Sequence, residues 1–186
     1  MKYFFETWNN EDFISVTGFD DESDEDLYRL VELILKIIDS STIYFEWCRT
    51  NFFYTVKQNE QNSKLLFECF EYNVDLRRIS TDTKKVKSKL YVGYKTSMSL
   101  AKKAIFYAWR AYEDVSFFSL KDFNYEKILE KYDNKMIGYG GFDLIKIVNA
   151  DVAISKNDTG DTLMIHARNL DVIENKLIDF GIIKSI

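Results

Sequence analysis

Residues 20–39 read DDESDEDLYRLVELILKIID, and they carry the clearest structural signal in the chain. Ser23, followed three residues later by Asp26, resembles a capping box with Asp in the usual Glu position. The acidic first turn complements the positive end of a helix dipole. Apolar residues then recur at helical spacing, at Leu27, Leu30, Val31, Ile34, Leu35 and Ile38. This pattern predicts an amphipathic helix over residues 24–39.

Short aromatic-rich runs on both sides of this helix alternate in the way that β-strands do. Candidate strands lie at residues 3–8 and 13–19 before the helix, and at 43–49, 52–57 and 64–72 after it. The connections between neighbouring runs are short and polar, which favours antiparallel hairpins because parallel neighbours need long crossovers. We therefore expect an antiparallel sheet of about four or five strands in the N-terminal half, with one inserted helix.

The C-terminal half combines helices with one β-hairpin. The expected elements are a helix from about Ser97, a shorter helix over 125–132, a hairpin formed by 151–156 and 162–168, and a final helix over 172–178 that ends at Gly181. Alanines at 101, 104, 108 and 111 give the first of these helices a stripe that allows close packing. Residues 90–94 and 142–148 are compatible with either helix or strand.

Clustered strands and helices, without strict alternation, indicate the α+β class. At 22.0 kDa the chain has the size of one domain, which we expect to span residues 1–186. The composition shifts near residue 80, where a run of lysines begins, so a division into two lobes at that point is the alternative.

The composition indicates a well-packed protein and restricts the classes of partner that it can bind. The chain has no proline and is 46% hydrophobic, so its turns must use Asn, Asp, Ser and Gly. A net charge of −5 argues against a protein whose main task is to grip phosphate backbones, but it permits binding to a basic surface. With two cysteines, no signal peptide and no long apolar run, we expect a reduced, cytoplasmic protein that does not enter membranes.

Few residues suggest catalysis. His166 is the only histidine, which excludes a multi-histidine metal site within one chain and makes a structural role the simpler interpretation. Cys48 and Cys69 fall on predicted strands, where a buried thiol behaves as a small hydrophobic group rather than as a nucleophile.

The loop segments match no ligand-binding motif, and we expect no cofactor. The acidic run is no EF-hand, because Glu25 stands where the sixth position requires Gly. Residues 93–97 lack the upstream glycine of a phosphate-binding loop, and 138–141 do not match a dinucleotide-binding motif. The lysines at 84–89 are best interpreted as a solvated face, so direct binding of nucleic acid is disfavoured.

The acidic run remains the best candidate for a contact surface. We expect its carboxylates to bind a basic protein, such as a nuclease, with exposed aromatic side chains as anchors: Asp20, Asp21, Glu22, Asp24 and Glu25. In size, acidity and lack of catalytic motifs the chain is similar in general character to bacterial immunity proteins and phage anti-defence inhibitors, including anti-CRISPR proteins. That similarity implies a non-enzymatic inhibitor. The alternatives are a small cytosolic enzyme with a carboxylate, Tyr and Lys site, and a structural or homo-oligomeric component.

Overall fold

The computed structural model confirms the α+β class. It describes residues 3–8, 13–20, 23–39, 44–47, 57–69, 75–77, 90–94, 98–111, 115–119, 150–156 and 162–185. The helices in these ranges are α1 (Asp24–Ile38), α2 (Lys57–Glu68), α3 (Met98–Ala111) and α6 (Leu170–Asp179). The strands are β1 (Phe4–Trp8), β2 (Phe13–Thr17), β3 (Tyr44–Trp47), β4 (Asp75–Arg77), β5 (Leu90–Tyr94), β6 (Val115–Ser119), β7 (Val152–Lys156), β8 (Leu163–Ala167) and β9 (Ile183–Lys184).

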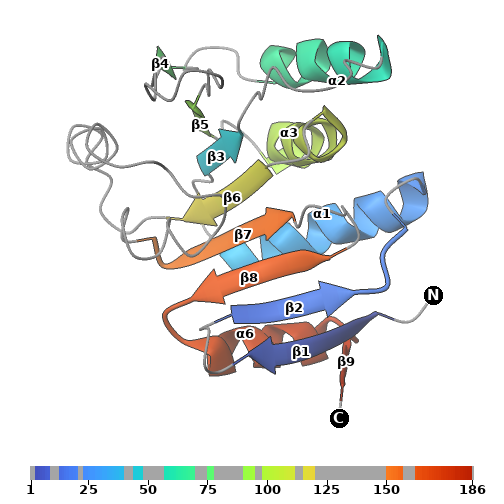
Figure 1. Cartoon of the computed structure of the whole chain (residues 1–186), viewed down its shortest axis with the longest axis vertical. Helices are drawn as coiled ribbons and strands as arrows, with labels where there is room; N and C mark the ends of the chain where they lie inside the picture. The colour runs from blue at the N-terminus through green and yellow to red at the C-terminus, as the bar shows by residue number, and fades with distance from the viewer. Residues whose placement is uncertain are drawn as a thin grey trace, which may run out of the picture.

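The described strands follow the order β4-β5-β3-β6-β7-β8-β2-β1-β9, and all their pairings are antiparallel except that of β1 with β9. The hairpin formed by β1 and β2 therefore lies beside the C-terminal hairpin formed by β7 and β8, through the pairing of β2 with β8 (Figure 1). Sequence reasoning assigned these two hairpins to different halves of the chain. In the structure they are neighbours, and β9 then pairs with the outer edge of β1.

One face of the sheet is covered by helices, and the core lies between the two layers. Four fully buried residues form a row across β2, β8, β7 and β6: Ile14, Ile165, Ile154 and Phe117. Helix α1 packs over β6 and β7 and also contacts α3 and α6. Figure 1 views the opposite face, with α1 and α6 behind the strands. On this face Ala153 and His166 are buried, whereas β1 exposes Phe4 and Trp8, and we call the part formed by β1 the open face.

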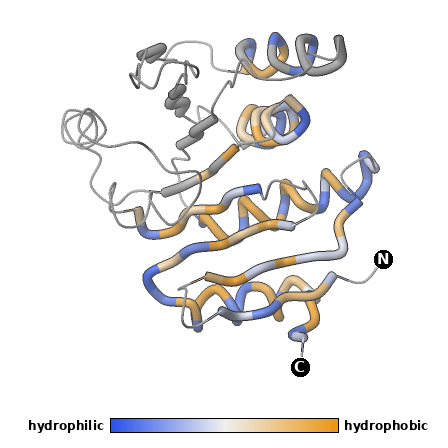
Figure 2. The backbone as a smooth tube through the Cα atoms, in the orientation of Figure 1, coloured by the Kyte–Doolittle hydropathy of each residue, from blue (hydrophilic) through white to orange (hydrophobic). Residues whose placement is uncertain are grey.

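Helix α1 forms as its sequence pattern predicts. It begins at Asp24 and ends at Ile38, with Asp39 in the left-handed conformation as its C-terminal cap. Hydrophobic and hydrophilic segments alternate along it (Figure 2), which is the pattern of a helix with one buried face. The ammonium of Lys176 on α6 donates a hydrogen bond to the carbonyl oxygen of Ile37 over 3.0 Å. A cation thus supplies a donor for a carbonyl in the last turn of α1, at the negative end of the helix dipole.

The strand predicted over residues 64–72 is wrong, because Lys64–Glu68 belongs to α2. The polar residues 58–63, predicted to form a connection, are helical as well. Asn62, Leu66 and Cys69 are buried at intervals of four and three residues, which is the spacing of one helix face. Helix α2 packs against α3, and this tertiary contact favours a helix for an apolar run that is also compatible with a strand.

Several other predicted segments are confirmed, whereas β4, β6 and β9 were not predicted from the sequence. The strands expected over 3–8 and 13–19 are β1 and β2, and the expected C-terminal hairpin is β7 and β8. The ambiguous residues 90–94 are β5, the helix expected from about Ser97 is α3, and the final predicted helix is α6. Gly181 follows α6 with a φ of 86°, as a helix-terminating glycine should. The predictions for 125–132, 138–141 and 142–148 lie outside the described residues.

Candidate functional site

The acidic end of α1, which we define as Asp20, Asp21, Glu22, Asp24 and Glu25, is the site predicted from the sequence. Asp20, Asp24 and Glu25 are exposed, whereas Asp21 and Glu22 lie outside the described residues. The structure thus places three of the five carboxylates at the beginning of one helix, facing solvent.

Ser23 starts this helix as predicted, but the capping box is only half formed. The hydroxyl of Ser23 accepts a hydrogen bond from the backbone N–H of Asp26 over 3.4 Å. The carboxylate of Asp26 does not return to Ser23. It accepts the backbone N–H of Asp20 over 3.2 Å and the hydroxyl of Tyr3 over 2.5 Å. Asp26 therefore joins α1 to Tyr3, directly before β1, and to Asp20 in the loop before the helix, and it holds the acidic end of α1 in place.

Tyr3 is the buried partner in this arrangement. Its side chain is 2% exposed, its ring stacks on Phe19 with 4.4 Å between ring centroids, and the guanidinium of Arg29 lies 4.6 Å from the ring centroid. Burial, reinforced by the hydrogen bond to Asp26, raises the pKa of Tyr3 to about 12. A phenol with such a pKa is a poor general acid or base near neutral pH, so this contact is structural.

A ladder of side-chain pairs joins α1 to α3 beside the acidic end. Asp24 pairs with Arg110 over 2.5 Å, and one turn further Tyr28 stacks on Phe106 with centroids 4.9 Å apart. Another turn along, Glu32 pairs with Lys102 over 3.1 Å.

This ladder uses one of the predicted contact residues and exposes an aromatic neighbour. The carboxylate of Asp24 has a partner within the molecule, Arg110, which lies far away in the sequence. Tyr28 is 59% exposed, one turn from Asp24 on the same face of α1. Sequence reasoning did not single out Tyr28. Its spacing of four residues from Asp24 is the signal that points to it.

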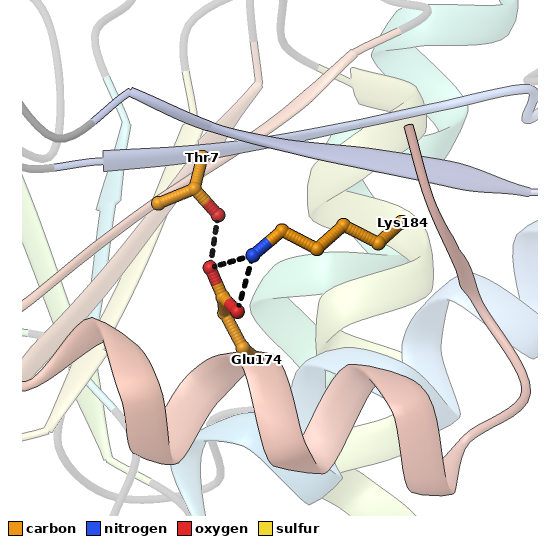
Figure 3. Close-up of polar contacts among 3 residues, drawn as sticks. All are labelled: Thr7, Glu174 and Lys184. Carbon is orange, nitrogen blue, oxygen red and sulfur yellow. Dashed lines mark hydrogen bonds and ion pairs between the residues drawn. The ribbon is translucent and has the colours of Figure 1, made fainter. Parts of the chain in front are cut away.

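A second polar cluster, formed by Thr7, Glu174 and Lys184, lies on the covered side of β1 (Figure 3). The ammonium of Lys184 donates to both carboxylate oxygens of Glu174, over 2.8 and 2.7 Å, and the hydroxyl of Thr7 donates to Oε1. These hydrogen bonds, from Lys184 first and Thr7 second, lower the pKa of Glu174. The cluster connects β1, α6 and β9, and it holds the short C-terminal strand against β1.

The residues considered for catalysis from the sequence are buried where they are described. His166 is buried on β8, and its ring lies 5.4 Å from that of Phe13. Cys69 follows α2, and its thiol donates to the carbonyl oxygen of Leu65 over 3.2 Å. Burial raises the pKa of the Cys69 thiol, which disfavours the nucleophilic thiolate. Cys48 lies outside the described residues.

The part of the chain that the structure describes lacks both a metal-binding cluster and a membrane-spanning helix. It holds no group of three or more His, Cys, Asp or Glu residues arranged to bind a metal ion. None of its helices combines the length and apolar character that crossing a bilayer requires.

Comparisons of the chain with protein families, with curated proteins and with solved structures give no match.

Proposed function

We propose that this chain is a non-enzymatic inhibitor that binds and neutralises a larger basic protein, such as a nuclease, through the acidic end of α1. The observation that supports this most is the exposure of Asp20, Asp24 and Glu25 at the start of one helix, with the exposed ring of Tyr28 one turn away. Carboxylates steer a cationic surface toward the molecule, and an aromatic ring supplies contact area once the two surfaces meet.

The carboxylates do not contribute equally to this proposal. The negative charge of Asp24 is paired with the positive charge of Arg110, so its attraction for an external cation is partly cancelled within the molecule. Glu25, its exposed neighbour, is expected to contribute more to the attraction of a basic partner. Asp24 serves mainly to position α1 against α3.

The partner is sought by immobilising the chain and identifying proteins retained from the native host and its phages. The proposal predicts one stoichiometric, basic, nucleic-acid-processing enzyme, whose activity falls to zero at one equivalent of this chain. A retained enzyme that keeps full activity in the complex contradicts inhibition.

The alternative is a small enzyme with a carboxylate, Tyr and Lys site. The cluster of Thr7, Glu174 and Lys184 supplies the carboxylate and the lysine of such a site, with Thr7 in place of a tyrosine. Each polar group there already donates to or accepts from another member of the cluster, which favours a structural role. Glu174→Gln distinguishes the two roles: it abolishes turnover of a co-purified small molecule if the cluster is catalytic, and lowers only stability if it is structural.

A further inference from the structure

Strand β1 presents a second unusual surface on the open face of the sheet. Phe4, Glu6 and Trp8 are exposed and alternate with side chains that face the helices. We call these three residues the β1 stripe. Phe4 is 39% exposed and Trp8 is 42% exposed, which is unusual for aromatic side chains on a regular strand.

The ring of Trp8 is held in a defined position. It stacks on Phe13 of β2 with 5.9 Å between centroids and an interplanar angle of 12°. Its Nε1–H donates to the hydroxyl oxygen of Ser15 over 3.1 Å. Because a fixed ring loses little conformational freedom on binding, Trp8 provides a preorganised contact. At the other end of the stripe, Ile183 of β9 lies in register with Phe4 and is also exposed.

Glu6 gives this aromatic surface a negative centre. The cross-strand neighbours of the stripe on β2 and β9 are the uncharged residues Phe13, Ser15, Thr17 and Ile183. Residues two apart on a strand face the same side, at a spacing of about 7 Å. Glu6 thus lies between Phe4 and Trp8 along this face, at a spacing that one long side chain can reach.

This arrangement fits a cationic guanidinium group better than an anionic phosphate group. A guanidinium can donate hydrogen bonds to a carboxylate while its plane lies over an aromatic face within about 6 Å. A phosphate group is repelled by Glu6 and by the net charge of −5, which disfavours stacking of nucleic-acid bases on the same rings.

We propose that the β1 stripe binds an arginine side chain on an extended basic segment of a partner protein. This inference rests on the proposed function, since it takes the basic partner as given and assigns it a second contact. The two surfaces are close along the chain: Thr17 pairs with Phe4, and Asp20 follows Thr17 by three residues, at most about 11 Å of extended backbone. An extended segment attracted by the acidic end of α1 can therefore reach the stripe at Phe4.

The test uses the whole chain, isotope-labelled, with a hexa-arginine peptide as the probe and backbone and indole N–H resonances as the readout. We expect hexa-arginine to shift the signals of Glu6 and of the Trp8 indole. Glu6→Gln should raise the Kd about threefold to fivefold, because it removes the charge and keeps the shape. Trp8→Leu should weaken binding similarly, whereas Trp8→Phe, which retains an aromatic face, should bind more tightly than Trp8→Leu. Unchanged far-UV spectra confirm that each variant is folded.

Glu25→Gln is the matched control at the other surface. It should weaken hexa-arginine binding without abolishing the shift of the Trp8 indole. If only signals from residues 20–25 respond, and Glu6→Gln binds as the wild type does, the stripe proposal is wrong while the proposed function stands. Equal shifts of the Trp8 indole with a decathymidylate oligonucleotide also overturn it, since they indicate a stacking surface for nucleic acid. If hexa-arginine shifts the signals of Glu6 and the Trp8 indole as expected, but the chain inhibits no basic partner enzyme, the proposed function fails and the stripe proposal stands.

Discussion

The two faces of β1 use their polar groups in opposite ways. On the face covered by helices, the hydroxyl of Thr7 donates to a carboxylate on α6, and the hydroxyl of Tyr3, directly before β1, donates to a carboxylate on α1. On the open face, the carboxylate of Glu6 lies exposed beside an exposed indole. The two sides of one short strand thus differ: the covered side fixes the strand in the fold, and the open side exposes charge and aromatic surface, which we propose as a contact for a partner.

The largest expected difference is between adjacent phenylalanines. Phe5 is 1% exposed and Phe4 is 39% exposed. Phe5→Ala should lower the free energy of unfolding by about 3–5 kcal/mol, because it removes buried apolar surface and leaves a cavity. Phe4→Ala should cost less than about 1 kcal/mol. Urea denaturation of both variants checks the comparison, and equal losses would show that the two faces are equally buried.

Tyr3→Phe should have the next largest effect, a loss of about 1–3 kcal/mol, since it leaves the Asp26 carboxylate short of one donor. The pKa of Tyr3 is raised from 10.0 to about 12 in the folded protein. The unfolded chain therefore releases this proton first, and stability falls as the pH rises from about 10 to about 12. In Tyr3→Phe that part of the alkaline loss should be absent. Denaturation midpoints across this pH range provide the measurement, and identical pH profiles for the two proteins would contradict the account.

Glu174→Gln should cost about 1–2 kcal/mol by weakening the hydrogen bonds that connect α6, β1 and β9. The folded pKa of Glu174 lies below its usual 4.5, so its contribution is present above that pH and is lost as the pH falls through the folded pKa. The difference in stability between wild type and Glu174→Gln should therefore shrink below about pH 4.5. A difference that stays constant down to acid unfolding would argue against a charge-dependent contact. Asp171→Asn, in the exposed first turn of α6, is the control.

The smallest change in stability is expected at the acidic end of α1. Asp24→Asn should cost about 0.5 kcal/mol, because it breaks a pair with Arg110 in which the carboxylate is largely exposed. Glu25→Gln should be nearly neutral for stability. For association with a basic partner the order should reverse, with Glu25→Gln the slower variant. Denaturation and stopped-flow association measured on the same two proteins test both orders together.

The parts of the fold that were predictable have local causes. Helix α1 was predicted because Ser23 and the apolar spacing lie within one segment, and β1 and β2 because their alternation is visible in the sequence. Helix α2 was missed because its apolar end, Lys64–Glu68, is compatible with two structures and its packing against α3 decides between them. Long-range contacts decided that case, and a single local pattern does not encode them.

The candidate site shows the same limit. The exposure of Asp20, Asp24 and Glu25 was expected from their charge, but the Asp24–Arg110 pair spans 86 residues of sequence and was not. Alternation separates Phe4, Glu6 and Trp8 from their neighbours. It does not indicate which set faces the helices, because aromatic residues occupy both sides of the strand.

The central claim, that the acidic end of α1 attracts a basic partner, is tested most directly by the association rate with that partner as a function of salt. We predict association at least about tenfold faster at low than at high ionic strength for the wild type. A folded Asp20→Lys, Asp21→Lys, Glu22→Lys variant should lose most of that acceleration. A charge-reversed variant that is folded and associates as fast as the wild type at low salt would contradict the claim.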